Sequence, residues 1–134
     1  MSTDLAYLAG VIDGEGTITL TKNSKSDMFR RIEVSVSNTD KGLIDWLQTE
    51  FGGSIRTRAL QKSRYKIAYE WRIKGANQAL DLLKRVTPYL RVRSKKCRAE
   101  FICRHYAEVT RRNGRYSDDE KADKWAFELS VLSL

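Results

Sequence analysis

The sequence predicts one α+β domain, residues 1–134, built on an antiparallel sheet whose helices gather on one face. Three observations predict this fold. A strand–strand–helix pattern occurs twice, a helical pattern precedes it, and further helices follow, which gives the order αββαββα plus a C-terminal helix. The 134 residues suffice for one hydrophobic core and leave no room for a second domain. Hydrophobic residues at 41% and charged residues at 31% are typical of a globular protein.

The first half of the chain begins with a helix and continues into paired strands. Residues 3–13 are predicted to be helical because apolar residues recur at helical spacing, namely Leu5, Leu8, Ala9 and Ile12. Alternating apolar and polar residues then predict a strand at 17–23 and a second one from Met28 onward, joined by a polar turn. A helix over 39–51 follows, and the pair Gly52-Gly53 ends it.

The second half repeats this pattern and adds two helices. Strands are predicted at 55–60 and 65–74, and a helix at 76–86. The C-terminal helices occupy residues 95–132, and the last of them begins at Ser117, where the run Ser-Asp-Asp-Glu fits a capping box. The apolar stripe that this last helix is expected to turn inward consists of Trp125, Leu129 and Leu132.

The charge of the chain points to a polyanionic partner. The net charge is +8, and the basic residues concentrate between acidic terminal segments. Dense basic strips of this kind are typical of proteins that contact nucleic-acid phosphates, although a solvated basic surface is the plain alternative. Lys96 belongs to the second basic cluster and is expected to touch phosphate.

The predicted sheet, within residues 17–74, has one face free of helices. Because strand side chains alternate, the polar members of each strand share that face, and a β-ribbon can enter the major groove of DNA. A solvated strand face is again the alternative. The residues expected to contact DNA from this face are Thr19, Thr21, Asn23, Arg31, Glu33, Ser35, Ser37, Arg56, Arg58, Lys66, Ala68, Glu70 and Arg72, with Arg56 and Arg58 the best guanine readers.

Several classes of protein are excluded by what the sequence lacks. No apolar run is long enough for a membrane span, and the N-terminus has no secretory charge pattern, so we expect an intracellular protein without a membrane partner. Cys97 and Cys103 do not have the spacing of a zinc site and are expected to be reduced. His105 is the single histidine, which excludes His-based triads and multi-histidine metal sites.

The N-terminal helix has an unusual face. Ala6, Gly10 and Gly14 are spaced by four, so one side of the helix is nearly bare, and small residues at that spacing allow two helix backbones to approach closely. Helix termination alone would explain Gly14 but not Gly10, since a glycine within a helix costs about 0.5–1 kcal/mol against alanine.

Two carboxylates, Asp13 and Glu15, stand near the end of this helix. An anion there meets the negative end of the helix dipole, and pairing of two such helices about a two-fold axis would bring the acids still closer. A divalent cation would relieve both effects, and oxygen ligands with several waters suit Mg²⁺. Ordinary turn chemistry is the alternative for an Asp-Gly-Glu-Gly segment.

Residues 8–16, Leu-Ala-Gly-Val-Ile-Asp-Gly-Glu-Gly, resemble the signature of the LAGLIDADG homing endonucleases. The matching positions are Leu8, Ala9, Gly10, Ile12, Asp13 and Gly16. Val11 is a mild apolar change, Gly14 replaces another small residue, and Glu15 replaces the last aspartate. The resemblance extends over the strand–strand–helix duplication and implies a saddle-like sheet that binds double-stranded DNA.

The resemblance also implies roles for individual residues. The interface of a homodimer would be formed by Ala6, Leu8, Ala9, Gly10, Asp13 and Gly14. Glu15 would coordinate the catalytic metal, with the carbonyl of Gly14 nearby, and Asn38 would organise metal-bound water. A basic residue, either Arg93 or Lys95, would support the active site. The metal would be Mg²⁺; Mn²⁺ would substitute for it, and Ca²⁺ would support binding without cleavage.

Three functions remain open from the sequence. The first is a homodimeric endonuclease that makes double-strand cuts with 3′ overhangs at a long, near-palindromic site, because only one motif is present. The second is a protein of the same fold that binds DNA or RNA without cleavage, such as a splicing maturase. The third is an unrelated basic α+β module that binds RNA or ribosomes.

Overall fold

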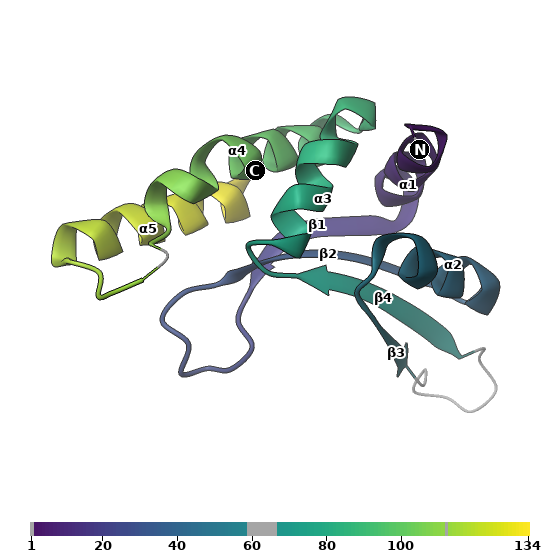
Figure 1. The fold of residues 1–134 in the computed structure, drawn as a ribbon, viewed down its shortest axis with the longest axis horizontal. Coiled ribbons are helices and arrows are strands. Elements are labelled where there is room, and N and C mark those ends of the chain that lie inside the picture. Colours follow the sequence, from purple (N-terminus) through teal and green to yellow (C-terminus); the bar gives the residue numbers. More distant parts are fainter. Residues whose placement is uncertain (1, 59–66, 112) are drawn as a thin grey trace.

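The computed structural model describes residues 2–58, 67–111 and 113–134 (Figure 1). Its elements, in chain order, are α1 (Ser2–Glu15), β1 (Gly16–Thr21), β2 (Arg31–Asn38), α2 (Lys41–Phe51), β3 (Ser54–Arg58), β4 (Ala68–Lys74), α3 (Gln78–Val86), the 3₁₀ helix η1 (Thr87–Tyr89), α4 (Arg93–Val109) and α5 (Asp118–Ser133). The predicted strand segments 59–60 and 65–66 lie outside the described residues, as does Lys66.

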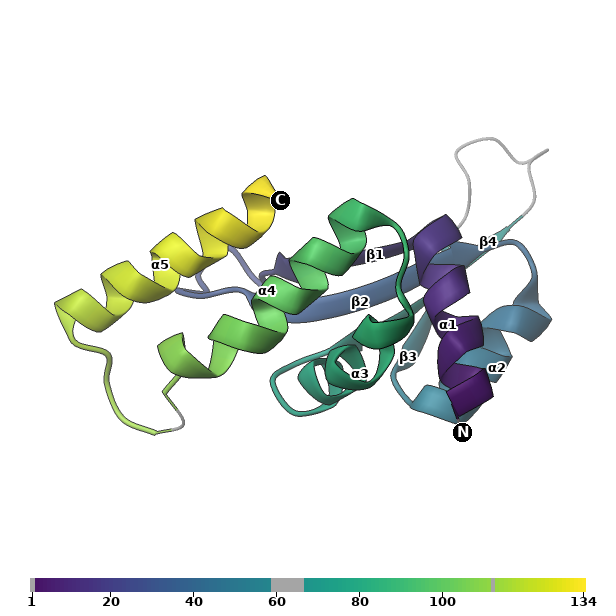
Figure 2. The same ribbon diagram turned by 90° about the horizontal axis from the view of Figure 1, so that it is seen from above.

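The four described strands form one antiparallel sheet in the order β1-β2-β4-β3. The two hairpins therefore meet along β2 and β4, at the centre of the sheet. Helices α1 to α4 lie above this sheet, and none of the described helices covers its lower face (Figures 1 and 2). The predicted fold class, a duplicated strand–strand–helix unit with its helices on one face, is confirmed.

The core lies between the sheet and the helices. The inward residues of the strands alternate as predicted, and they are Ile18, Leu20, Ile32, Val34, Val36, Trp71 and Ile73. Full burial of one such side chain stabilises the fold by about 1.5–3 kcal/mol. Trp71 also donates from Nε1 to the carbonyl of Gly52 at 2.7 Å, so its polar atom has a partner in the interior.

Helix α1 is longer than its apolar pattern predicts. It ends at Glu15 instead of residue 13, and strand β1 begins directly at Gly16. A Cβ at Gly16 would lie 2.6 Å from the Cα of Ile12, so only glycine allows the chain to leave the helix so closely. Gly14 and Glu15 therefore belong to the last turn of the helix, not to a turn after it.

Helix α5 faces the opposite way from its prediction. Its capping box between Ser117 and Glu120 is confirmed. The expected inward stripe is wrong, because Trp125, Leu129 and Leu132 are 44%, 65% and 38% exposed. The buried residues of the helix are Lys124, Phe127, Glu128 and Val131. Two of these four are ionic, and each has partners from other elements, which a hydrophobicity pattern does not register.

Candidate functional site

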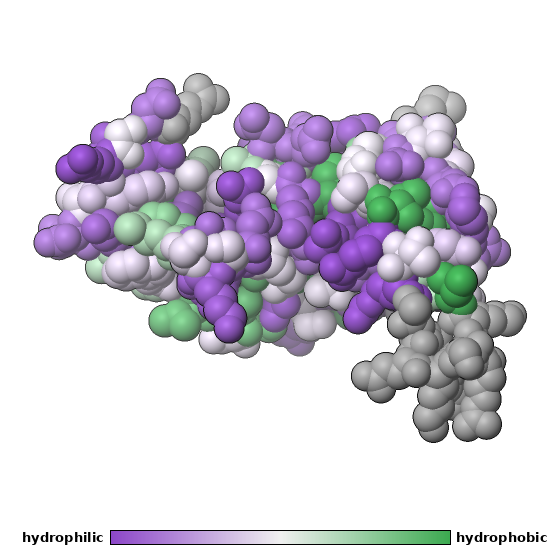
Figure 3. Space-filling view, turned by 90° about the horizontal axis from the view of Figure 1, so that it is seen from below, coloured by the Kyte–Doolittle hydropathy of each residue, from purple (hydrophilic) through white to green (hydrophobic). Residues whose placement is uncertain are grey.

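The sheet face without helices carries the polar residues that the strand alternation predicts. Directly paired residues across antiparallel strands share a face, and the register aligns them in rows. One row joins Ser37, Glu70 and Arg56; a second joins Thr17, Ser35, Arg72 and Ser54; a third joins Thr19, Glu33 and Lys74. Thr21 with Arg31 and Ala68 with Arg58 continue the pattern at its ends. The structure thus gathers the predicted strand residues on one surface, which is hydrophilic over its centre (Figure 3).

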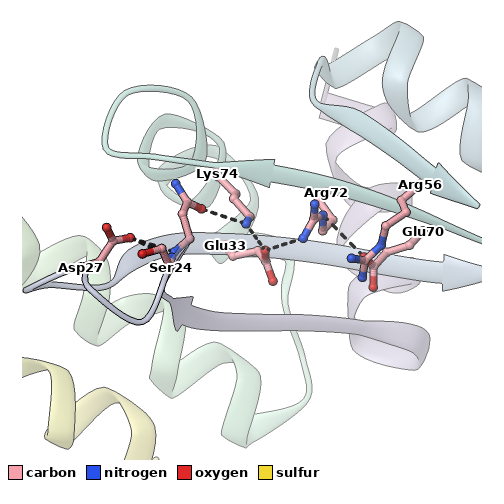
Figure 4. A network of polar contacts seen from close by, with 8 residues as sticks. Ser24, Asp27, Glu33, Arg56, Glu70, Arg72 and Lys74 are labelled. Carbon is pink, nitrogen blue, oxygen red and sulfur yellow. Dashed lines mark hydrogen bonds and ion pairs between the residues drawn. The ribbon is translucent and has the colours of Figure 1, made fainter. Parts of the chain in front are cut away.

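Two residues of this face, Thr17 and Lys74, were not among those expected to bind DNA. The same alternation places them there, so the signal was present in the sequence. Asn23 lies beyond the end of β1, in the β1–β2 loop, but remains connected to the face. Lys74 Nζ donates to its Oδ1 at 3.2 Å, and Asn23 N donates to Asp27 Oδ2 at 2.9 Å (Figure 4).

Lys96 does not lie on this surface. It belongs to α4, in the helix layer, and lines a hollow beside α1 together with Ala6 and Gly10. The structure therefore places Lys96 apart from the sheet residues, and its contact with phosphate stays a prediction. The periodicity of a helix does not say which of its neighbours the helix meets, and α4 turns this lysine toward α1.

Four cations of the sheet face are paired with two carboxylates. Glu70 lies 2.9 Å from Arg56 Nη2, and its carboxylate also approaches Arg72 Nε at 3.5 Å and Arg58 Nη1 at 3.8 Å. Glu33 lies 3.3 Å from Lys74 Nζ and 3.6 Å from Arg72 Nη1. Arg72 consequently sits between both acids (Figure 4). The sequence placed these groups on one face but did not reveal this pairing.

The end of α1 brings together two predicted catalytic residues. Glu15 is exposed, and Asn38 at the end of β2 donates from Nδ2 to Glu15 Oε2 at 2.5 Å. The other side-chain atom of Asn38, Oδ1, accepts from the backbone N–H of Asp40 at 2.7 Å. Because both ends of the amide are engaged, the carboxylate of Glu15 is held at the junction of α1, β1 and β2.

Asp13 fastens the helix layer rather than pointing toward the sheet face. Its carboxylate accepts from the backbone N–H groups of Arg91 at 2.8 Å and Val92 at 3.1 Å. These contacts offset the cost of an anion at the negative end of the helix dipole. Asp13 therefore holds the end of α1 to the segment that leads into α4.

Lys95 and Arg93 occupy different environments. Lys95 Nζ donates to the carbonyls of Ile12 at 2.7 Å and Asp13 at 2.8 Å, so it satisfies two terminal acceptors of α1. Arg93 is exposed at the first position of α4. Of the two alternatives, the structure brings Lys95 to the helix end that carries Glu15.

The C-terminal end of α1 carries oxygen atoms that could hold a metal ion. The carboxylate of Glu15 and the backbone carbonyl of Gly14 are oxygen donors, which suit a hard divalent cation. Within the described residues, however, no three His, Cys, Asp or Glu side chains lie close enough to hold a metal together. The donor types therefore fit Mg²⁺, an ion that is commonly held by one or two carboxylates and keeps several waters.

The outer face of α1 is bare, as its spacing of small residues predicts. Ala6, Gly10 and Gly14 are exposed, and a Cβ built on either glycine meets no described atom within 4 Å. Leu8 and Ala9 are fully buried in the core of their own subunit, so their prediction as interface residues is wrong. They stand on the side of the helix that meets the sheet, and no surface remains for a partner to cover.

Two grooves border this bare face. The larger, about 510 Å³, is lined by Ala6, Tyr7, Gly10, Val11, Gly14, Glu15, Asn38 and Leu43. The smaller, about 290 Å³, is lined by Ala6, Gly10, Asp13, Pro88, Tyr89, Leu90, Arg91 and Lys96. Together they leave α1 as a ridge with free space on either side, and the larger groove leads directly to Glu15.

The fold and the site define a class of protein that comparison with known families identifies. Residues 2–104 match the family model of the LAGLIDADG-like domain, so this chain belongs to that family. A relative is the intron-encoded RNA maturase bI4 of Saccharomyces cerevisiae, 36% identical over 62 residues, which are 46% of this chain and 9% of the maturase. The match thus spans only a small part of that longer protein.

Solved structures show the same fold. The homing endonuclease I-CvuI, solved in complex with its target in the presence of 2 mM Ca, superimposes with a TM-score of 0.70 at 18% identity, covering 98% of this chain and 82% of that one. The archaeal intron-encoded homing endonuclease I-Vdi141I, solved with DNA, gives a TM-score of 0.54 at 12% identity, and the match covers 98% of both chains.

None of the described helices is long and apolar enough to cross a membrane.

Proposed function

We propose that the chain is a homodimeric, Mg²⁺-dependent DNA endonuclease that makes double-strand cuts with 3′ overhangs at a long, near-palindromic site. One observation carries the proposal. A single exposed carboxylate, Glu15, is oriented by Asn38 at the end of a helix whose outer face is bare. Two copies joined along this face would bring two such carboxylates together, and proteins commonly hold Mg²⁺ with one or two carboxylates and several waters.

The sheet face is the DNA-contacting surface in this proposal. It presents hydroxyls and guanidinium groups in aligned rows, and a two-stranded ribbon fits the major groove. A two-fold dimer would place two such faces side by side and read two half-sites. The solved relatives I-CvuI and I-Vdi141I were each crystallised with DNA, which supports this assignment.

The residues at the end of α1 have distinct roles. Glu15 and the carbonyl of Gly14 would hold the divalent ion, which when bound activates water and stabilises the leaving 3′ oxygen. Asn38 keeps the Glu15 carboxylate in place through its 2.5 Å hydrogen bond. Lys95 holds the helix end by its bonds to two carbonyls and places a positive charge beneath the site.

A second candidate function is RNA binding in intron splicing. The sequence relation to the maturase bI4 favours it specifically. That function needs no carboxylate at the dimer axis, so the two candidates differ in what they require of Glu15.

The test is cleavage of duplex DNA by the wild type and by Glu15→Gln. A randomised duplex library is first selected for binding to the wild type in Ca²⁺, and the selected duplex is then incubated with Mg²⁺ or Mn²⁺. We expect double-strand cuts by the wild type, no cuts by Glu15→Gln, and equal binding by both proteins. Glu50→Gln, at an exposed position of α2, is the matched control and should cleave normally.

Cleavage by Glu15→Gln at the wild-type rate would overturn the assigned role of Glu15. Selection of no duplex by the wild type, together with tight binding of a structured RNA, would favour the maturase function.

A further inference from the structure

Two carboxylates occupy the middle of an otherwise basic surface. Glu33 and Glu70 are only 9% and 8% exposed, although they point from the uncovered side of the sheet. The groups that cover them are three arginines expected to contact DNA and one further cation of the same face, namely Arg56, Arg58, Arg72 and Lys74. A surface that only attracted phosphate would gain nothing from acids at its centre.

The pairing orients the cations but leaves most of their donors free. Only the Arg56–Glu70 contact, at 2.9 Å, is also a hydrogen bond; the other contacts to the two acids are ion pairs at 3.3–3.8 Å. Arg72 Nε and Glu33 Oε1 are buried without a hydrogen-bond partner among the described residues. Since a guanidinium carries five N–H donors in a rigid plane, these side chains can still donate to another acceptor.

The network also reaches the loop between β1 and β2. Lys74 bridges Glu33 and Asn23, and Asp27 in turn accepts from the backbone of Asn23 and Ser24 at 2.9 and 3.2 Å. Figure 4 shows this line of contacts running from Asp27 to Arg56 along the sheet. The orientation of each cation is therefore tied to that of the next.

The charge balance of this network determines which kind of DNA contact it favours. Four cations face two carboxylates, so half of their charge is cancelled before DNA arrives. Attraction to the phosphate backbone depends on net charge and is the same for every sequence. Hydrogen bonds to base edges depend on the direction of the donor, and a fixed guanidinium fork matches the O6 and N7 acceptors of guanine.

We infer that Glu33 and Glu70 are positioning residues for DNA recognition, which hold the arginines toward base edges and at the same time suppress binding to arbitrary DNA. The inference rests on the proposed function. Glu33 and Glu70 then serve specificity mainly through the arginines, not as base contacts of their own. The two glutamates should therefore affect the ratio of target to non-target affinity more than the affinity for the target itself.

The experiment compares binding of two duplexes by wild type, Glu70→Gln and Glu70→Asp. One duplex is the site selected by the wild type and the other is a scrambled duplex of the same composition, both in Ca²⁺ over a series of salt concentrations. For Glu70→Gln we expect tighter binding of the scrambled duplex, a fall of about tenfold in the affinity ratio, and a salt dependence steeper by about one phosphate contact. Glu70→Asp keeps the charge but retracts the carboxylate, so it should lower the ratio without changing the salt dependence.

Glu50→Gln removes the same charge away from the sheet face and should leave the affinity ratio unchanged. Should Glu70→Gln and Glu70→Asp both retain the wild-type ratio, the inference is wrong while the proposed function stands. Equal losses on both duplexes would show a merely structural role for Glu70. If Glu70→Gln does not fold, Glu33→Gln takes its place beside Glu70→Asp. A wild type that prefers no duplex would overturn the proposed function and this inference together.

Discussion

Helices α1 and α5 both expose one face to solvent, but the two faces differ in kind. The outer face of α1 consists of Ala6, Gly10 and Gly14, with grooves on either side. The outer face of α5 carries Trp125 and Leu129, which are large and apolar. The small residues of α1 would let another helix backbone approach closely. The large exposed residues of α5 show only that other side chains of that helix fill its inward positions.

The inward positions of α5 include two charged residues, Glu128 and Lys124, and each has a hydrogen-bond partner. Glu128, 1% exposed, accepts from the backbone N–H of Arg30 at 2.9 Å and from its Nη1 at 3.0 Å. Lys124 donates to Thr110 Oγ1 at 2.6 Å, and its ammonium lies 4.8 Å from the ring centre of Tyr106. Burial lowers the pKa of Lys124, and the charge of Glu128 opposes that shift. These contacts fasten α5 to the residue that precedes β2 and to the C-terminal end of α4.

Among the variants that test this difference between α1 and α5, Glu128→Ala should have the largest effect. The substitution leaves the partly buried guanidinium of Arg30 and a backbone N–H without their acceptor, and breaking a buried ion pair from one side costs about 3–5 kcal/mol. Because Arg30 is 33% exposed and can be partly hydrated, we expect a loss near the lower figure, about 3 kcal/mol, in the free energy of unfolding by urea. Glu128→Gln, which keeps acceptor and shape, should lose less; equal losses would mean that charge alone matters.

The bare face of α1 is tested by Gly10→Leu. A Cβ built at Gly10 meets no described atom within 4 Å, and leucine favours a helix more than glycine does, so the subunit should fold at least as stably as the wild type. In the proposed dimer it would hold the two helices apart, and we expect the dissociation constant to rise about 100-fold, which corresponds to about 2.7 kcal/mol. Sedimentation equilibrium measures this constant, and Ala107→Leu on the exposed side of α4 is the control. An unchanged constant would show that α1 is not the interface.

The smallest effect is expected from Leu129→Ser. At 65% exposure the leucine buries little apolar area, so the free energy of unfolding should change by less than about 0.5 kcal/mol. Urea unfolding of this variant beside Val131→Ala, whose side chain is fully buried, separates the two sides of α5. A large loss for Leu129→Ser would contradict the orientation of the helix.

Regular patterns in the sequence predict most of the fold. The alternation in β1, β2 and β4 predicts which residues face the helices, and the burial of Ile18, Val34 and Trp71 confirms it. Helix termination does not explain Gly10, and the structure shows this residue exposed on the bare face of α1. The ends of the helices were less predictable. Helix α1 extends to Glu15, where Gly16 lies close against Ile12, and no periodicity in the sequence indicates this contact.

The candidate site was predictable in its components more than in its contacts. Family resemblance selected Glu15 and Asn38, and the structure joins them by a hydrogen bond. Leu8 and Ala9 belong to the same motif but lie in the core, since a motif does not separate residues that face a partner from residues that face the sheet.

The sequence by itself determined the periodicities, and with them the sheet, the side of each strand that is polar, and the small residues of α1. Tertiary structure alone decided the partners of the charged groups: Glu128 with Arg30, Lys95 with the end of α1, and Glu70 with three arginines. The physical reason is that hydrophobic burial depends on the local spacing of apolar residues, whereas a buried charge depends on groups that are distant in the chain.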